Sequence, residues 1–180
     1  MRIGPTPIGG VMLVELEPLG DERGFFARSF CAGEFAAAGL DTRVAQCNVS
    51  HNARRATLRG MHWQEEPHAE AKLVRCTAGA IHDVVVDIRP GSPTFLRWAA
   101  FELTRDNRHA LYVPPGVAHG FQTLADDSEV FYQMSVPYAP ASARGARWDD
   151  PAFAIGWPLP SPIVSARDRG YPDFRVAGAP

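Results

Sequence analysis

Glycine and proline interrupt this chain so often that long helices are excluded. The 180 residues include 16 glycines and 16 prolines, and the segments between them are short and rich in β-branched and aromatic side chains. Turns are indicated at Arg89–Pro93 and at Val113–Gly116. Many short strands joined by such turns predict an all-β fold, an antiparallel jelly-roll sandwich or barrel with very little helix.

The pattern predicts nine strands and one short helix. The predicted strands are Val11–Leu16, Gly24–Phe30, Arg43–Ser50, Lys72–Cys76, Ala80–Arg89, Leu96–Thr104, His109–Val113, Gly120–Leu124 and Glu129–Ser135. Gly33–Gly39 is the predicted helix. In Ala80–Arg89 the alternation puts Asp83 and Asp87 on one face and most apolar side chains on the other. The proline-rich tail from about residue 158 is expected to lie over the surface without pairing in a sheet.

Length and composition predict one domain, residues 1–180, with an ordinary globular core. Hydrophobic residues make up 46% of the chain and charged residues 21%. A formal charge of -2 and a pI near 6.3 argue against a nucleic-acid partner. No apolar run is long enough to span a membrane, and the N-terminus lacks the apolar stretch of a secretory signal. Cys31, Cys47 and Cys76 are scattered and odd in number, which predicts no disulfide framework and a cytoplasmic location.

Lysine occurs only once in the sequence, at Lys72, against 17 arginines. A single lysine in an arginine-rich chain indicates a task that needs a compact ammonium group, because arginine, with its planar guanidinium group, is used wherever either cation suffices. The alternative is that one lysine remains by chance, and the count alone leaves both interpretations open.

Four further side chains have contexts that suit chemistry. His62 lies in a stretch expected to be a strand opening into a pocket, where an imidazole serves as a general base, a metal ligand or a core residue. His119 follows a Pro-Pro-Gly turn that aims it inward. Tyr132 is either a core tyrosine or a phenol that returns a proton to a carbanion. Asp168 is either a solvated carboxylate or the partner that orients a histidine.

Seven short motifs follow one another along the chain. They are Asp21–Phe26 (DERGFF), Leu58–Gln64 (LRGMHWQ), Lys72–Cys76 (KLVRC), Val86–Arg89 (VDIR), Pro93–Phe95 (PTF), Val113–Phe121 (VPPGVAHGF) and Arg147–Asp150 (RWDD). In this order and spacing they resemble the dTDP-4-dehydrorhamnose 3,5-epimerases, sugar-nucleotide epimerases of the cupin superfamily. The resemblance runs from about Val11 to Asp168.

The resemblance implies a jelly-roll homodimer that acts on a dTDP-4-keto-6-deoxyhexose and needs no metal or other cofactor. It implies that His62 removes the proton α to the keto group, with Asp168 as its dyad partner. Tyr132 would deliver a proton to the opposite face. Lys72 would hold the keto oxygen as it becomes an enolate, which gives the single lysine a task, because developing oxyanion charge is best met by a fixed cation.

The same resemblance implies a substrate-binding set. Arg23 and Arg59 would bind the diphosphate, where a guanidinium suits the phosphate oxygens. The other members are Gln46, Asn48, His119 and Tyr138, of which Tyr138 would stack on the nucleotide base. The expected partner is therefore a small nucleotide sugar, and neither nucleic acid nor a membrane.

The chain departs from the family pattern in the substrate-binding set. Arg28 and Ala143 stand where the family usually places glutamates, and the family's Asp-Asn-His pattern after Gln46 is replaced by Cys47-Asn48-Val49. We therefore expect the proton-transfer chemistry to be kept, whereas these replacements leave open which nucleotide and sugar are recognised. The residues leave open whether C3, C5 or both are inverted.

Other function classes remain as alternatives. One is a metal-dependent cupin, a dioxygenase or isomerase, that binds its ion through His62, Glu66 or Glu70, and His119. Gln64, where such cupins usually carry a second histidine, argues against it. Another is a mono-epimerase acting on a different nucleotide sugar. A third is a cupin that binds sugar nucleotides without catalysis, which the joint presence of the four proton-transfer residues disfavours.

Overall fold

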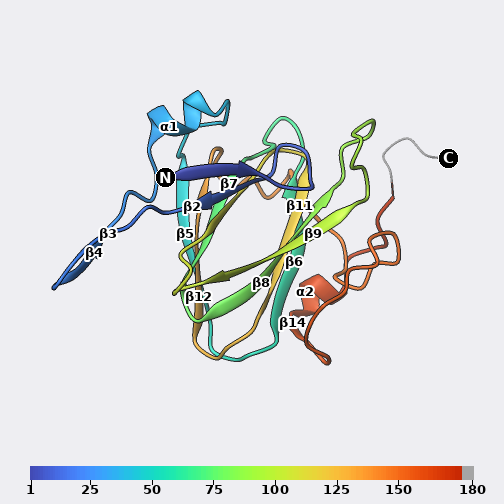
Figure 1. The fold of residues 1–180 in the computed structure, drawn as a ribbon. Coiled ribbons are helices and arrows are strands. Elements are labelled where there is room, and N and C mark those ends of the chain that lie inside the picture. Colours follow the sequence, from blue (N-terminus) through green and yellow to red (C-terminus); the bar gives the residue numbers. More distant parts are fainter. Residues whose placement is uncertain (176–180) are drawn as a thin grey trace.

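Two antiparallel sheets form the body of the molecule, in a computed structural model that describes residues 1–175 (Figure 1). The first sheet has the order β1 (Arg2–Pro5), β2 (Met12–Glu15), β10 (Ala110–Val113), β7 (Lys72–Ala78), β12 (Ser128–Met134) and β5 (Gln46–Asn52). The second has the order β13 (Ala143–Gly145), β6 (Thr57–Gln64), β11 (Val117–Thr123), β8 (Ala80–Asp87) and β9 (Trp98–Thr104). The predicted antiparallel sandwich is confirmed.

Helix is scarce, as the glycine and proline content predicts. Within residues 1–175 the helices are α1 (Ala32–Ala37) and α2 (Ala166–Arg169). The first lies in the predicted helical segment and ends before Gly39, whose φ of 72° glycine adopts without strain. The second was not predicted. Neither of these helices is long and apolar enough to cross a membrane.

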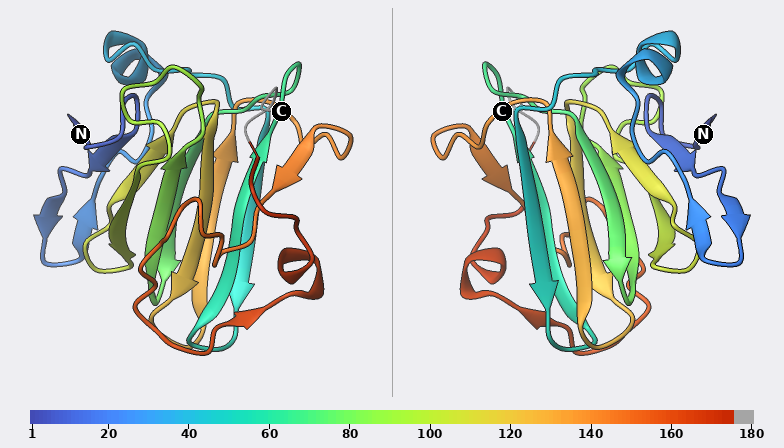
Figure 2. Two further views of the ribbon diagram at one scale, coloured as in Figure 1. Left: turned by 90° about the vertical axis from the view of Figure 1, so that its right-hand side faces the viewer. Right: turned by 90° about the vertical axis from the view of Figure 1, so that its left-hand side faces the viewer.

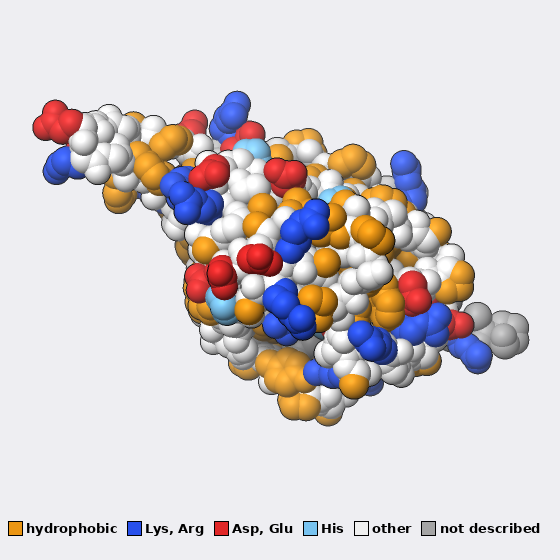
Figure 3. All heavy atoms as spheres, turned by 90° about the horizontal axis from the view of Figure 1, so that it is seen from below, with side chains coloured by type: hydrophobic (Ala, Val, Ile, Leu, Met, Phe, Trp, Pro, Cys, Tyr) orange, Lys and Arg blue, Asp and Glu red, His pale blue; other side chains and the backbone are white. Residues whose placement is uncertain are grey.

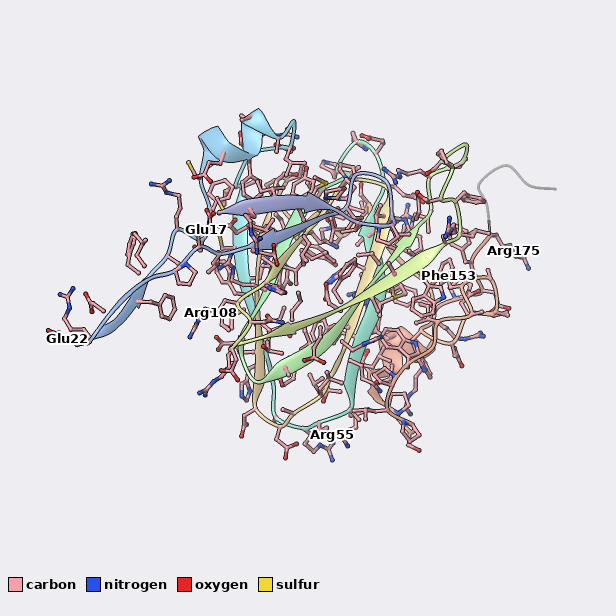
Figure 4. The ribbon with its side chains drawn as sticks, in the orientation of Figure 1. Glu17, Glu22, Arg55, Arg108, Phe153 and Arg175 are labelled. Atoms are coloured by element: carbon pink, nitrogen blue, oxygen red, sulfur yellow. The ribbon has the colours of Figure 1, made fainter. Side chains whose placement is uncertain are left out.

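All nine predicted strands overlap observed ones, with one clear shortening. The predicted strand Gly24–Phe30 ends at Phe26 as β4 (Gly24–Phe26), which among residues 1–175 pairs only with β3 (Leu19–Asp21). This hairpin projects away from both sheets, with Glu22 near its tip (Figures 2 and 4). Leu19 and Phe26 are 74% and 70% exposed, so the hairpin presents apolar side chains to solvent. The other strands are β1, β3, β6, β13 and β14, and β6 contains His62, whose stretch was expected to be a strand.

The hydrophobic core fills one part of the space between the sheets. Val74, Leu111 and Val130 from the first sheet pack there with Ile81 and Val85 from the second. Both faces of β8 are buried, because its other face packs under the C-terminal segments. Asp83 and Asp87, predicted to share a face, are both fully buried. The core does not fill the whole space between the sheets, because other residues of β5, β7 and β12 face residues of β6 and β11 across a cavity.

The C-terminal tail corrects a prediction. The tail was expected to pair with no sheet, but β14 (Ile163–Val164) lies parallel to β6, opposite Thr57 and Leu58. Strand β13 covers the same edge of β6 only from His62 to Gln64, so the backbone groups at the start of β6 need another partner. Strand β14 supplies it, and its position fixes where α2 begins.

Candidate active site

A cavity of about 610 Å³ opens in the part of the sandwich that the core does not fill. Its walls come from β5, β7 and β12 of the first sheet, from β6, β11 and β13 of the second, and from α2. On the molecular face seen from below, basic and acidic side chains are interspersed with apolar ones (Figure 3). Seven of the ten sequence-predicted site residues line this cavity: Arg59, His62, Lys72, His119, Tyr132, Tyr138 and Asp168.

His62 and Asp168 form a hydrogen-bonded pair, as the sequence predicts. His62 Nε2 lies 2.8 Å from Asp168 Oδ1, and Asp168 Oδ2 accepts a bond from the backbone N–H of Gly60 at 3.3 Å. Burial acts to raise the pKa of Asp168, but the bonds from His62 and Gly60 hold it below its ordinary value. An ionised carboxylate only accepts hydrogen bonds, so Nε2 carries a proton, and in a neutral imidazole the lone pair is then on Nδ1. That tautomer is the one a general base needs.

Helix α2 brings Asp168 to this position. Ser165 is its N-cap, and the Ser165 hydroxyl accepts a hydrogen bond from the backbone N–H of Asp168 at 3.0 Å. The Asp168 side chain is 6% exposed, against 37% for His62. The carboxylate is therefore shielded from water, and the ring that it binds is the more open of the two at the cavity.

A second histidine–carboxylate pair lies beside the first. His119 Nε2 is 2.7 Å from Asp83 Oδ1, and His119 pairs with His62 across the β11–β6 ladder. The Asp83 side chain is fully buried and that of His119 is 12% exposed. No site role was predicted for Asp83 from the sequence. The signal for it was a carboxylate inside a strand of mostly apolar residues.

Lys72 is held at the cavity wall by two acceptors. Its Nζ lies 2.8 Å from Glu70 Oε1 and 3.4 Å from the backbone carbonyl of His62. The side chains of Lys72 and Glu70 are 11% and 3% exposed, so this is an ion pair largely removed from water. The sequence predicted Glu70 only as an alternative metal ligand.

Tyr132 faces the histidines from the opposite sheet. It lies on β12, whereas His62 and His119 lie on β6 and β11. Burial raises the pKa of the Tyr132 phenol, against a smaller lowering by the nearby Arg59 charge. The phenol therefore holds its proton at neutral pH and is able to donate it.

Three arginines add positive charge to the cavity. Arg59 Nε donates to Asn52 Oδ1 at 2.7 Å, Arg144 Nε lies 2.9 Å from Glu65 Oε2, and Arg167 Nε donates to the Tyr171 hydroxyl at 2.9 Å. Only Arg59 was predicted as a site residue. Arg144 and Arg167 lie in segments where an arginine is ordinarily a solvated side chain, so their positions alone gave no signal.

Two predicted binding residues support the wall of the cavity and are not among its lining residues. Gln46 Oε1 accepts a bond from the backbone N–H of Tyr138 at 2.9 Å, and Gln46 Nε2 donates to Asn48 Oδ1 at 2.8 Å. Asn48 Nδ2 in turn lies 3.5 Å from Met134 Sδ. Both amides thus contact residues that line the cavity.

Arg23 does not reach the cavity of its own chain. It lies in the β3–β4 hairpin, paired with Asp21, and its side chain is 84% exposed. Of the two positions at which a family glutamate is replaced, Ala143 lines the cavity. Arg28 lies outside that lining, 2.8 Å from Glu34 Oε1 on α1.

The metal-dependent alternative does not fit these side chains. Within residues 1–175 no cluster of three or more His, Cys, Asp or Glu side chains is arranged to hold a metal ion. His62 and His119 each bind a separate carboxylate, and Glu70 is paired with an ammonium group.

Known proteins resemble the chain over nearly its whole length. The family described as dTDP-4-dehydrorhamnose 3,5-epimerase matches residues 5–175. The 3,5-epimerase of Sinorhizobium fredii is 43% identical over 168 residues, 93% of this chain and 86% of that protein. The dTDP-4-dehydrorhamnose 3-epimerase of Streptomyces niveus is 39% identical over 94% of this chain and 82% of its own length. A crystal structure of the 3,5-epimerase from Bacillus anthracis with TDP and PPi bound has 39% identity and a TM-score of 0.93, covering 96% of this chain and 99% of that one.

Proposed function

Because this chain belongs to the dTDP-4-dehydrorhamnose 3,5-epimerase family and is a sugar-nucleotide epimerase, we propose that it inverts both C3 and C5 of dTDP-4-dehydro-6-deoxyglucose to give dTDP-4-dehydrorhamnose. The observation that carries this proposal is the placement of the His62–Asp168 pair and Tyr132 on facing walls of one cavity. Removal of a proton from one face of the sugar and delivery to the other inverts the carbon between them.

His62 is the general base in this proposal. The Nδ1 lone pair takes the proton α to the keto group, and Asp168 stabilises the imidazolium that forms. Loss of the proton leaves the electron pair of the C–H bond on the carbon. This pair is delocalised onto the keto oxygen, and an enolate forms. Lys72, with its ammonium group at the cavity wall, donates a hydrogen bond to that oxygen where the charge develops.

Tyr132 is the acid that completes the inversion. It lies on the sheet opposite His62, so a sugar ring bound between the sheets presents one face to each residue. The raised pKa of the phenol keeps the proton available until the enolate collapses. The carbon then receives its new proton from the side opposite to the one that lost it.

The remaining cavity residues bind the nucleotide in this proposal. Arg59 binds the diphosphate through its guanidinium group, and His119 binds the sugar next to His62. Tyr138, which is 48% exposed at the cavity, stacks on the base. Gln46 and Asn48 hold the wall from which Tyr138 extends.

A homodimer would give a role to Arg23, which does not line the cavity of its own protomer. We propose that the β3–β4 hairpin of one protomer reaches the cavity of its partner and brings Arg23 to the diphosphate. The exposed apolar side chains of the hairpin, Leu19 and Phe26, support this placement because they would be covered by the partner. Arg23→Ala and His62→Ala protomers are each expected to be inactive as homodimers. A mixture that exchanges subunits is expected to recover activity, since a mixed dimer contains one intact cavity; a mixture that stays inactive contradicts the placement.

Proton NMR in heavy water tests the reaction itself. The protein is incubated with dTDP-4-keto-6-deoxyglucose, and loss of the C3 and C5 hydrogen signals is followed, with His62→Ala as the control. Exchange at both carbons supports the proposal. Exchange at one carbon alone makes the protein a mono-epimerase, like the Streptomyces niveus relative by name. No exchange at either carbon means that Arg28 and Ala143 accompany another nucleotide or sugar, and the UDP analogue is then the next substrate to test.

A further inference from the structure

Glu70 is a buried carboxylate at the cavity to which the proposed function assigns no task. Its side chain is 3% exposed, and the residue lines the cavity just before β7 begins. One carboxylate oxygen, Oε2, is buried without a hydrogen-bond partner among residues 1–175. Burial of a carboxylate is unfavourable unless a charge compensates it, so its place here requires an explanation.

The compensating charge is the Lys72 ammonium, 2.8 Å from Glu70 Oε1. An ammonium group has three N–H donors. Glu70 accepts one, and the backbone carbonyl of His62, at 3.4 Å from Nζ, accepts a second. The third donor is left for a ligand in the cavity. Two fixed acceptors therefore restrict a group that otherwise rotates freely at the end of a four-carbon stem.

We propose that Glu70 is a positioning residue that holds the Lys72 ammonium so that its remaining N–H faces the keto oxygen of the bound sugar. This inference rests on the proposed role of Lys72 at the enolate. The backbone carbonyl of His62 places the same ammonium next to the general base, so Glu70 also sets the distance between the group that removes the proton and the group that stabilises the enolate charge. A purely structural ion pair would serve the fold without affecting that distance.

Two substitutions separate these roles. Glu70→Gln keeps the size of the side chain and one acceptor oxygen, whereas Glu70→Ala removes the acceptor. Glu66→Gln changes an exposed glutamate of the same β6–β7 connection and is the matched control. For each variant we would measure kcat and KM for deuterium exchange at C3 and C5, together with inhibition by dTDP, which lacks the keto oxygen.

A misplaced ammonium is expected to lower kcat, because small displacements of a catalytic group cost about 10- to 100-fold. Glu70→Ala should show this loss of kcat. Its KM and its inhibition constant for dTDP should stay within about twofold of wild type, the range within which independent sites behave additively. Glu70→Gln should recover part of it, and Glu66→Gln should match wild type. If Glu70→Ala does not fold, Glu70→Gln decides: a lower kcat at unchanged KM supports the inference, and an unchanged kcat overturns it.

A double-mutant cycle with Lys72→Met shows whether Glu70 acts through the lysine. If it does, Glu70→Ala produces no further loss of kcat in the Lys72→Met background; an equal loss in both backgrounds overturns the inference. A wild-type protein that exchanges neither hydrogen contradicts the proposed function. A wild-type protein that exchanges both, beside a Glu70→Ala variant with the same kcat, contradicts only the role of Glu70. Unchanged kcat in Lys72→Met overturns the roles of both residues and leaves the epimerase assignment intact.

Discussion

The two histidine–carboxylate pairs of the cavity have the same chemistry and different supports. His62 and His119 are partners across the β6–β11 ladder, and each points Nε2 at a carboxylate, at 2.8 and 2.7 Å. Asp168 comes from the short helix α2 in the C-terminal tail, whereas Asp83 comes from β8 inside the sheet. One pair is therefore assembled by docking of the tail, and the other is built into the sandwich.

The difference appears in the exposure of the rings. The His62 side chain is 37% exposed and that of His119 is 12% exposed. A base that takes a proton from a ligand must present its free nitrogen to the cavity, while a binding residue benefits from being fixed. The more open ring suits proton transfer, and the ring held within the sheet suits binding. The difference in exposure thus supports the different tasks that we propose for the two histidines.

Substitution of the histidines should produce the largest effects. His62→Ala is expected to remove proton exchange, a loss of about 10²- to 10⁴-fold or more because a general base contributes that much, while dTDP binds nearly as in wild type. His119→Ala is expected to raise KM more than it lowers kcat. Steady-state exchange rates by NMR and dTDP titration measure both. Persistent exchange in His62→Ala would remove this residue from the role of base.

Substitution of the two carboxylates should produce the next largest effects, on kcat for one and on stability for the other. Asp168→Asn is expected to lower kcat by about 10²- to 10⁴-fold, because an amide lets the imidazole adopt the wrong tautomer. Asp83→Asn is expected to act mainly on stability, lowering the free energy of unfolding by about 1–3 kcal/mol, since it alters a buried hydrogen bond. Urea denaturation and kcat on the same two variants test the contrast. Equal losses of kcat would show that both pairs take part in proton transfer.

Half of this comparison could be predicted from the sequence. The motif around His62 and the resemblance identified Asp168 as its partner, and alternation in β8 placed Asp83 correctly on a face with Asp87. Alternation does not say which strand lies beside that face. The β8–β11 register decides that Asp83 lies opposite Phe121 and within reach of His119, and a register arises from long-range packing.

The fold likewise has parts that local sequence pattern predicts and parts that depend on long-range packing. Short apolar segments between glycines and prolines predicted the main strands, because local pattern determines them. Strand β14 and helix α2 could not be predicted this way, since Ile163 pairs only because the start of β6 lacks a neighbour on that edge. Glu70 and Arg144 were missed as site residues for a related reason: their partners, Lys72 and Glu65, come together only in the folded chain.

A substitution of Tyr132, on the opposite wall of the cavity, separates proton removal from reprotonation. Tyr132→Phe removes the acid but leaves both histidine pairs in place, so proton removal should continue and reprotonation should slow or lose its direction. We expect kcat for the inverted product to fall by about 10²-fold or more, the scale of a general-acid contribution, with exchange of the starting sugar less affected. NMR that resolves both sugars measures the two rates. An unchanged ratio of products would place the acid elsewhere.

The smallest expected effect is on the pH dependence of stability. Asp168 has a pKa below its ordinary value in the folded protein, where the bonds from His62 and Gly60 outweigh burial. A carboxyl group of this kind contributes stability above its unfolded pKa of about 4, and the contribution is lost as the pH falls through the folded value. The difference in free energy of unfolding between wild type and Asp168→Asn should therefore narrow from pH 7 to pH 3 in urea titrations. Asp106→Asn, at a side chain that is 84% exposed, is the control. A difference that stays constant down to pH 3 would mean that His62 gives Asp168 no stabilisation in its ionised form, and the argument for His62 as the oriented base would lose its electrostatic support.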